Sequence, residues 1–326
     1  MVGPEKDVLV LEELGVPEPG PGEVRISVSV CGVCHTELDE IEGRTPPPRL
    51  PIIPGHQVVG HVEKCGVGVT NFRGGERVGV GWIHSSDGSE LENLSDAFKA
   101  TGRDANGGYA EYMVVPERYA YPIPEVFSDQ QAAPLLCGGS VGYRALKLCN
   151  LQDGEPLGLV GFGGSNHLVL QTARYLYPSS AIYVFARSPE SRALAVELGA
   201  QWVGSLEERP PRPPRAIIDT TPAWLPVRQA LRVLAPGGRL VINAIRKEDD
   251  DRQTLQELSY EKELWLEKEI KTVANVTSHD VREFLGIAAA VPLAPVVQCY
   301  PLVEANTALA DLKHGGGRGS KVLLIS

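Results

Sequence analysis

Residues 157–176 read LGLVGFGGSNHLVLQTARYL, in which a glycine-rich turn separates an apolar run from a longer amphipathic stretch. The apolar run Leu157–Val160 predicts a short buried strand, and the pattern from His167 to Tyr175 predicts a helix. Glycines between a strand and a helix permit a tight turn and let the backbone approach a phosphate at the helix N-terminus. The stretch therefore predicts the first strand, turn and helix of a dinucleotide-binding fold.

Downstream of this stretch, strands and helices are expected to alternate. Apolar runs predict strands at 181–186, 216–219 and 239–243, and the patterns between them predict helices at 191–198 and 225–234. Such alternation predicts a parallel sheet with right-handed crossovers. We therefore expect residues 140–275 to form a doubly wound, Rossmann-type α/β domain that binds a cofactor.

The first part of the chain has a different character. Val24–Val30 alternates between apolar and polar side chains, which is typical of a half-buried strand, and short strands broken by glycines are expected at 58–62 and 77–80. Residues 1–139 are therefore expected to form an irregular β-rich domain. Residues 276–326 are expected to return to that domain.

The composition excludes several classes of protein. The 326 residues are 43% hydrophobic and 22% charged, which indicates a globular chain of two packed units and not a disordered one. The net charge of −10 argues against a nucleic-acid or membrane partner, because phosphate binding needs clustered Lys and Arg. No apolar run approaches the roughly 20 residues that span a bilayer, and the N-terminus lacks a signal-peptide pattern, so a cytoplasmic location is expected.

Three short motifs could together hold a metal ion. Cys31-Gly-Val-Cys34 alone fits a redox pair or half of a zinc ribbon, but the absence of a second such pair excludes a four-cysteine ribbon. His56 and Cys137 bring the candidate ligands to three, the number that a catalytic zinc takes from a protein while its fourth position stays open. Two thiolates suit zinc better than magnesium or calcium. From the residues alone, two buried free cysteines and a core histidine are the alternative.

Four strings resemble the zinc-dependent alcohol dehydrogenases of the medium-chain dehydrogenase/reductase superfamily: CGVCHTEL at 31–38, PGHQVVG at 54–60, GGYAEY at 107–112 and APLLCGGSVGYRAL at 133–146. The resemblance covers nearly the whole chain and implies a GroES-like catalytic domain before the Rossmann domain. It implies one catalytic zinc per chain, with Cys34, His56 and Cys137 as ligands. It also implies hydride transfer between a primary or secondary alcohol, or the matching aldehyde or ketone, and a nicotinamide cofactor.

The resemblance implies roles for residues near these ligands. Thr36 takes the position of a proton-relay hydroxyl, which can both accept and donate, with a generic loop threonine as the alternative. His35 takes a position that touches the cofactor's pyrophosphate or assists the relay. Trp82 takes the place of a residue that lines the substrate pocket, with a packed core aromatic as the alternative. Gln57 stands where the family has a glutamate near the metal, which acts as a transient ligand or as a charge.

The chain also departs from the family. Many members bind a structural zinc with four cysteines, but residues 83–106 contain none, so no structural zinc is expected, and a short helix at 91–98 is expected in its place. Gln57 lacks the charge of the family's glutamate, and Glu37 replaces an aspartate with a longer carboxylate. Because the groups around the ligands tune the ion, we expect a stronger Lewis acid, with weaker zinc binding or a shifted pH optimum.

The glycine turn is expected to bind the cofactor. Gly161, Gly163 and Gly164 form the turn, where the first glycine permits the bend and the second lets the backbone approach the pyrophosphate. Asn166 takes the third position of the fingerprint, which is usually Gly or Ala. Its amide is expected to cap the helix or touch phosphate, and a slight opening of the strand–helix packing is the alternative.

The end of the next strand distinguishes NADP from NAD. No carboxylate stands at Ala186, where one would bind the ribose 2′-hydroxyl, and the residues that follow include Arg187, Ser188 and Arg192. A guanidinium can pair with a 2′-phosphate, so NADP(H) is favoured over NAD(H). The alternative is an exposed arginine and a loosely specific enzyme. Two further cofactor contacts are expected at Asn243 and Arg318.

Two other functions compete with this interpretation. A zinc-free quinone or enoyl reductase of the same superfamily would share the fold but would not need Cys34, His56 and Cys137. A non-catalytic binding protein derived from the family is the third hypothesis, because Gln57 and Asn166 are altered. The main hypothesis implies a small-molecule alcohol or carbonyl substrate, and the family forms homodimers or homotetramers.

Overall fold

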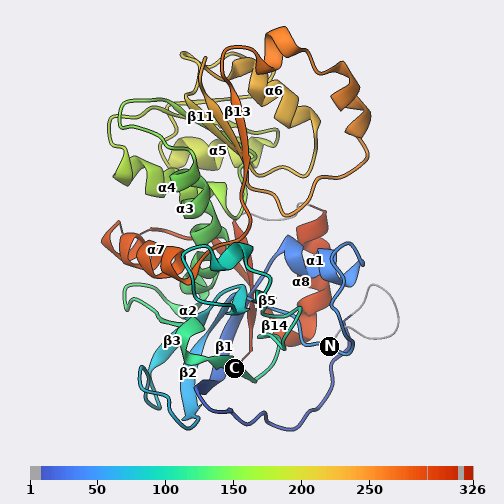
Figure 1. The fold of residues 1–326 in the computed structure, drawn as a ribbon, viewed down its shortest axis with the longest axis vertical. Coiled ribbons are helices and arrows are strands. Elements are labelled where there is room, and N and C mark those ends of the chain that lie inside the picture. Colours follow the sequence, from blue (N-terminus) through green and yellow to red (C-terminus); the bar gives the residue numbers. More distant parts are fainter. Residues whose placement is uncertain (1–8, 292, 315–318, 326) are drawn as a thin grey trace. The chain divides into compact units, whose positions relative to one another are not determined.

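The computed structural model describes residues 9–291, 293–314 and 319–325 (Figure 1). Contacts divide the chain into two units. The first comprises Met1–Ser140 together with Asn275–Ser326, and the second comprises Val141–Ala274. In the described ranges, each helix is too short or too polar to cross a bilayer.

The second unit is built on a six-stranded parallel sheet. Its strands lie in the order β10 (Trp202–Gly204), β9 (Ile182–Phe185), β8 (Leu157–Val160), β11 (Ala216–Asp219), β12 (Arg239–Ile242) and β13 (Glu269–Thr272). The order runs one way from β8 to β10 and the other way from β11 to β13, so the topological switch point lies between β8 and β11. Ligands of open α/β sheets bind at the carboxyl ends of the strands at such a point. This confirms the expected doubly wound class.

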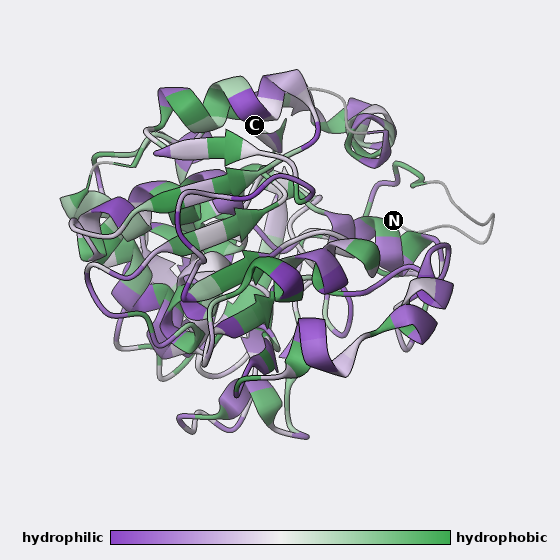
Figure 2. Ribbon diagram, turned by 90° about the horizontal axis from the view of Figure 1, so that it is seen from above, coloured by the Kyte–Doolittle hydropathy of each residue, from purple (hydrophilic) through white to green (hydrophobic). Residues whose placement is uncertain are grey.

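The helices of the second unit alternate with these strands, as expected. They are α4 (Asn166–Leu176), α5 (Pro189–Glu197) and α6 (Leu225–Val233), and short turns follow at η4 (Arg252–Glu257) and η5 (Tyr260–Leu264). Helix α5 begins earlier than expected because Pro189 starts it and the Ser188 hydroxyl accepts the Ser191 N–H. Figure 2 shows that hydrophobic and hydrophilic stretches alternate along the ribbon. In α6 the apolar residues Val227, Ala230 and Leu231 lie on the buried face of the helix.

The first unit is built on a seven-stranded sheet that is mostly antiparallel. A path of six strands runs β14 (Val297–Pro301), β15 (Ser320–Leu324), β1 (Glu23–Val33), β2 (Val58–Cys65), β3 (Arg77–Val80) and β7 (Ala120–Pro122), and β6 (Tyr112–Pro116) also pairs with β1. The long strand β1 is central, and its residues Val24, Ile26 and Val28 are fully buried in the core. Strand β1 leads directly to Cys34, so the core fixes the start of the candidate site.

Helices and turns surround this sheet. The α-helices are α1 (His35–Ile41), α2 (Asp129–Ala132), α7 (Ser278–Ala290) and α8 (Ala305–Lys313), and the 3-10 turns are η2 (Glu117–Tyr119), η3 (Ala133–Leu136) and η6 (Leu302–Glu304). Helix α3 (Gly138–Leu148) carries the chain from the first unit into the second. Strands β14 and β15 come from the end of the chain, so the C-terminal return completes the first sheet.

Residues 83–106 form a lobe held by a buried carboxylate. The lobe contains β4 (Ile83–Ser85), β5 (Lys99–Ala100) and one 3-10 turn, η1 (Glu92–Leu94), so the expected helix at 91–98 is wrong beyond that turn. The buried Glu92 carboxylate accepts the backbone N–H of Ser278 at 2.6 Å and the hydroxyl of Tyr119 at 3.0 Å. Burial, together with the bond to Glu92, raises the pKa of Tyr119 to about 12. Glu92 thus ties the lobe to the start of α7.

Candidate active site

Cys34 lies at the N-terminus of helix α1. Its backbone is extended, and its N–H donates to the Glu37 carboxylate at 2.8 Å, which fixes the first turn of the helix. The Cys137 thiol lies 4.0 Å from the Cys34 sulfur and, together with His56, lowers the pKa of Cys34 well below its usual value.

His56 is presented by a loop that only glycine permits. Gly55 has a φ of +98°, and a Cβ there would lie 2.3 Å from the ring of Tyr109. His56 itself is buried. Cys137 follows the 3-10 turn η3 and precedes α3, so three separate elements deliver the three side chains.

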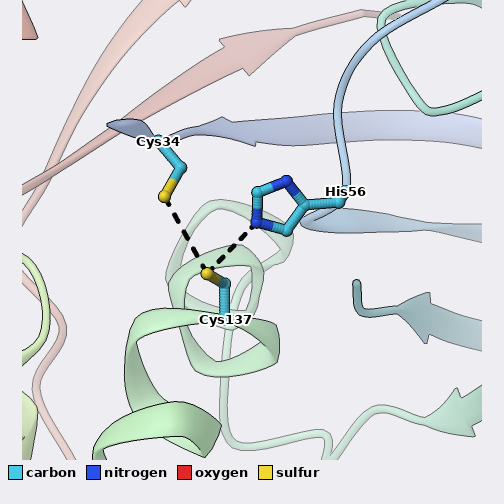
Figure 3. Close-up of side chains that lie close together, drawn as sticks. All are labelled: Cys34, His56 and Cys137. Atoms are coloured by element: carbon cyan, nitrogen blue, oxygen red, sulfur yellow. Dashed lines mark hydrogen bonds between the residues drawn. The ribbon is translucent and has the colours of Figure 1, made fainter. Parts of the chain in front are cut away.

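The three candidate ligand atoms converge on one point. The His56 Nε2 atom lies 3.2 Å from the Cys137 sulfur, and the ligand atoms of Cys34, His56 and Cys137 all lie within 4.8 Å of one another (Figure 3). A tetrahedral zinc holds two sulfurs about 3.8 Å apart and a sulfur and a nitrogen about 3.5 Å apart. The observed distances of 4.0 and 3.2 Å match that spacing closely, so these donors fit the ion.

Glu37 orients the histidine. Its Oε1 atom lies 2.6 Å from His56 Nδ1, and both side chains are buried, so Nε2 is left facing the two sulfurs. Burial raises the pKa of Glu37. Burial also disfavours the charged form of His56, but the Glu37 carboxylate and the Cys34 sulfur together outweigh this effect and raise the pKa of the imidazole. A carboxylate behind a ligating histidine fixes its ring and tautomer.

The remaining side chains near this cluster lie as follows. The Thr36 hydroxyl is 3.6 Å from the Cys34 sulfur, whereas the neighbouring His35 is exposed. Gln57 is buried, and its side chain packs against Gly32 of β1, where a Cβ would lie 2.6 Å from Gln57 Oε1. The Trp82 ring lies 6.1 Å from the His56 ring and contacts Phe98 edge-on.

Sequence reasoning missed Glu40. It lies one helical turn after Glu37 on the same face of α1 and is buried. Burial, reinforced by the nearby Glu37 carboxylate, raises the pKa of Glu40 to about 9. The spacing of three residues between the two glutamates is the signal that could have identified it.

Comparison with known proteins shows the family of this chain. The family model of the alcohol dehydrogenase GroES-like domain matches residues 20–125. The protein named "Probable alcohol dehydrogenase AdhA" of Mycobacterium tuberculosis is 40% identical over 321 residues, covering 95% of this chain and 91% of that protein. The chain belongs to the alcohol dehydrogenase family. It is an oxidoreductase that acts on alcohols and aldehydes.

Solved structures agree in fold with this dehydrogenase. A cinnamyl alcohol dehydrogenase from Sorghum bicolor has a TM-score of 0.82 at 26% identity, with 95% of this chain and 92% of that chain covered. A thermostable alcohol dehydrogenase from Pyrobaculum aerophilum, with cobalt and zinc bound, has a TM-score of 0.84 at 24% identity, with 97% and 95% covered. At that identity the second likeness shows the fold alone.

The second unit of the dehydrogenase carries the glycine turn. Gly161 has a φ of +76°, and a Cβ at Gly163 would face open space, so the backbone is accessible there. Asn166 is fully buried, and its amide group points at the carbonyls of Val160 and Gly161 and at the Thr220 hydroxyl.

The other expected cofactor residues have different surroundings. Arg187 is exposed just after β9, whereas the Arg192 guanidinium donates to the Ala186 carbonyl at 2.8 Å. Ser188 caps α5. Asn243 follows β12, and its buried Nδ2 atom has no hydrogen-bond partner among the described residues. Arg318 lies outside the described residues.

Proposed function

We propose that Cys34, His56 and Cys137 hold one catalytic zinc ion in this alcohol dehydrogenase. The observation that carries the proposal is the convergence of two thiols and one imidazole nitrogen within 4.8 Å, at spacings that suit a tetrahedral ion. Residues 83–106 contain no cysteine, which supports one zinc per chain and no structural zinc. When bound, zinc supplies a Lewis acid that lowers the pKa of an alcohol hydroxyl.

The chain's own residues position the substrate and move its proton. Thr36 lies beside Cys34, so its hydroxyl can accept the proton of the alcohol while it donates its own proton toward solvent. Glu37 holds the His56 ring. Trp82 and Phe98 form an apolar aromatic surface beside His56, which favours a substrate with an apolar body. A nicotinamide cofactor, when bound by the glycine turn of the Rossmann-type unit, would supply the acceptor or donor of the hydride.

A metal count and an activity assay on the purified protein test this function. We expect about one zinc per chain, and we expect chelation to abolish NADP-dependent oxidation of a panel of alcohols and zinc to restore it. A protein that holds no metal after incubation with zinc would contradict the proposal. Metal-independent reduction of an enone would favour the zinc-free reductase, and failure to bind either nicotinamide cofactor would favour a non-catalytic protein.

We also propose that the enzyme prefers NADP(H), with Arg187 as the residue that binds the 2′-phosphate. Arg187 is exposed after β9, no carboxylate stands at Ala186, and the Arg192 Nε donates to the Ala186 carbonyl. An arginine–phosphate pair contributes about 1.5–3 kcal/mol, so Arg187→Ala should raise the KM for NADP⁺ by about 10- to 100-fold and leave that for NAD⁺ nearly unchanged. Initial rates with both cofactors measure this. Arg209→Ala, at an exposed arginine of the same unit, is the control, and an equal loss with NAD⁺ would contradict the assignment.

A further inference from the structure

Lys247 is a nearly buried lysine in the loop that follows β12. Its side chain is 8% exposed. The ammonium group donates to the Asp219 carboxylate and to the carbonyls of Thr221 and Ala223, the last two at 2.7 and 3.0 Å. Three acceptors therefore take its three hydrogens. The loop after β12 is in this way tied to the loop after β11.

Asp219 completes this cluster from the end of β11. It is fully buried, and its second oxygen accepts the N–H and the hydroxyl of Thr221 at 3.0 and 2.8 Å. Removal of one partner from a buried, hydrogen-bonded ion pair leaves an uncompensated charge, which is far more costly than removal of both. Lys247 thus both neutralises Asp219 and fixes the backbone at 221–223.

The loop after β11, residues 220–223, lies directly against the glycine turn. A Cβ at Gly161 would lie 2.9 Å from the Thr220 hydroxyl oxygen and 3.2 Å from the Thr221 methyl carbon. From the other side, Asn166 Nδ2 bridges the Gly161 carbonyl at 2.7 Å and the Thr220 hydroxyl at 3.2 Å. The glycine turn therefore packs against Thr220 and Thr221, so a shift of the loop after β11 would also move the turn.

Further hydrogen bonds connect the loops after β11 and β12 along the carboxyl edge of the sheet. Asn243 N–H donates to the Asp219 carbonyl, and Glu248 N–H donates to the Pro222 carbonyl, at 2.8 and 2.7 Å. The Asp251 carboxylate accepts the N–H groups of Trp224 and Leu225 at the start of α6. Three loops, after β8, β11 and β12, are thus connected on both sides of the switch point.

We propose that Lys247 is a positioning residue for the cofactor: through Asp219 and Thr220–Thr221 it holds the glycine turn in the shape that receives the pyrophosphate. The inference rests on the proposed function, because it assumes a nicotinamide cofactor at this turn. Two effects combine. The contacts of Lys247 with Asp219 and the loop after β11 order the turn in advance, so that cofactor binding loses less conformational entropy. The Lys247 ammonium also cancels the charge of the Asp219 carboxylate, which would otherwise repel the phosphates.

The test compares Lys247→Met with the double variant Lys247→Met/Asp219→Asn and with Lys271→Met, a control at an exposed lysine of the same unit. NADPH affinity is measured by fluorescence titration, thermal stability by the melting temperature, and order of the turn by hydrogen exchange at residues 161–166 without cofactor. We expect Lys247→Met to raise the NADPH Kd by about tenfold or more and to speed exchange at the turn. The double variant should recover melting temperature but keep the fast exchange and part of the affinity loss.

The outcomes separate this inference from the proposed function. If Lys247→Met lowers the melting temperature while exchange at 161–166 stays as in the wild type, Lys247 serves stability alone and the inference is overturned. If Lys247→Met and the double variant bind NADPH within about twofold of wild type, the inference is also overturned. If the wild type binds neither NADPH nor NADH, the proposed function fails, and the exchange measurement still decides whether Lys247 orders the turn.

Discussion

Replacement of Cys137 by serine is expected to release the metal and to lower kcat/KM for alcohol oxidation by about a thousandfold or more. Cys137 lies between the other two candidate ligands, 4.0 Å from the Cys34 sulfur and 3.2 Å from His56 Nε2. A serine hydroxyl is a poor zinc ligand, so only one thiolate and one imidazole would remain. A thousandfold loss corresponds to about 4 kcal/mol, a reasonable share of the charge stabilisation that a Lewis acid supplies.

Metal content and activity must be measured on the same samples. Cys299→Ser is the matched control, because this thiol is exposed and lies apart from the three ligands, and it should retain both the metal and the activity. Circular dichroism should show that both variants are folded. A Cys137→Ser protein that keeps a full complement of zinc, or that oxidises alcohols at the wild-type rate, would remove Cys137 from the site.

Replacement of Glu92 by alanine is expected to lower the free energy of unfolding by about 3 kcal/mol. The Glu92 carboxylate is buried and accepts the Ser278 N–H at 2.6 Å and the Tyr119 hydroxyl at 3.0 Å. Alanine would leave both donors without this acceptor in a dry environment, and hydrogen bonds to a charged group each contribute about 1.5–3 kcal/mol. The lobe at 83–106 should also exchange its amide hydrogens faster, because Glu92 ties it to helix α7.

Urea unfolding followed by fluorescence measures the stability, and two variants calibrate the result. Glu92→Gln keeps one amide oxygen as an acceptor and should lose less than half as much stability as Glu92→Ala. Glu90→Ala changes an exposed glutamate two residues earlier and should have almost no effect. If Glu92→Ala unfolds at the same urea concentration as the wild type, the lobe is held by other contacts.

Much of the fold could be predicted from local patterns. The apolar runs at 157–160 and 216–219 become buried strands because a parallel sheet is covered on both faces, so its strands are apolar throughout. Strand β13, by contrast, is exposed at all four positions and reads EIKT, so it carries no such pattern. The helix expected at 91–98 failed because a buried Glu92, bonded to residues distant in the sequence, decides the path of that lobe.

The candidate site divides in the same way. The resemblance to the family, carried by short local motifs, identified Cys34, His56 and Cys137 as candidate metal ligands. The same patterns gave no sign of Lys247 or Glu92, because a lysine or glutamate in a loop usually faces solvent. Asn166 was identified, but its partners were not, since only the structure shows that its amide turns inward to Gly161.

The sequence by itself determined the residue types at the candidate metal site, four of the six strands of the second unit with the helices between them, and the glycines at the turn. These features depend on side-chain chemistry and on spacings of a few residues. The tertiary structure alone decided that Glu37 stands behind His56, that Glu92 anchors the lobe, and that Lys247 and Asn166 brace the glycine turn from two sides. Those roles depend on which distant segments meet in a buried place, where a polar group must find a partner.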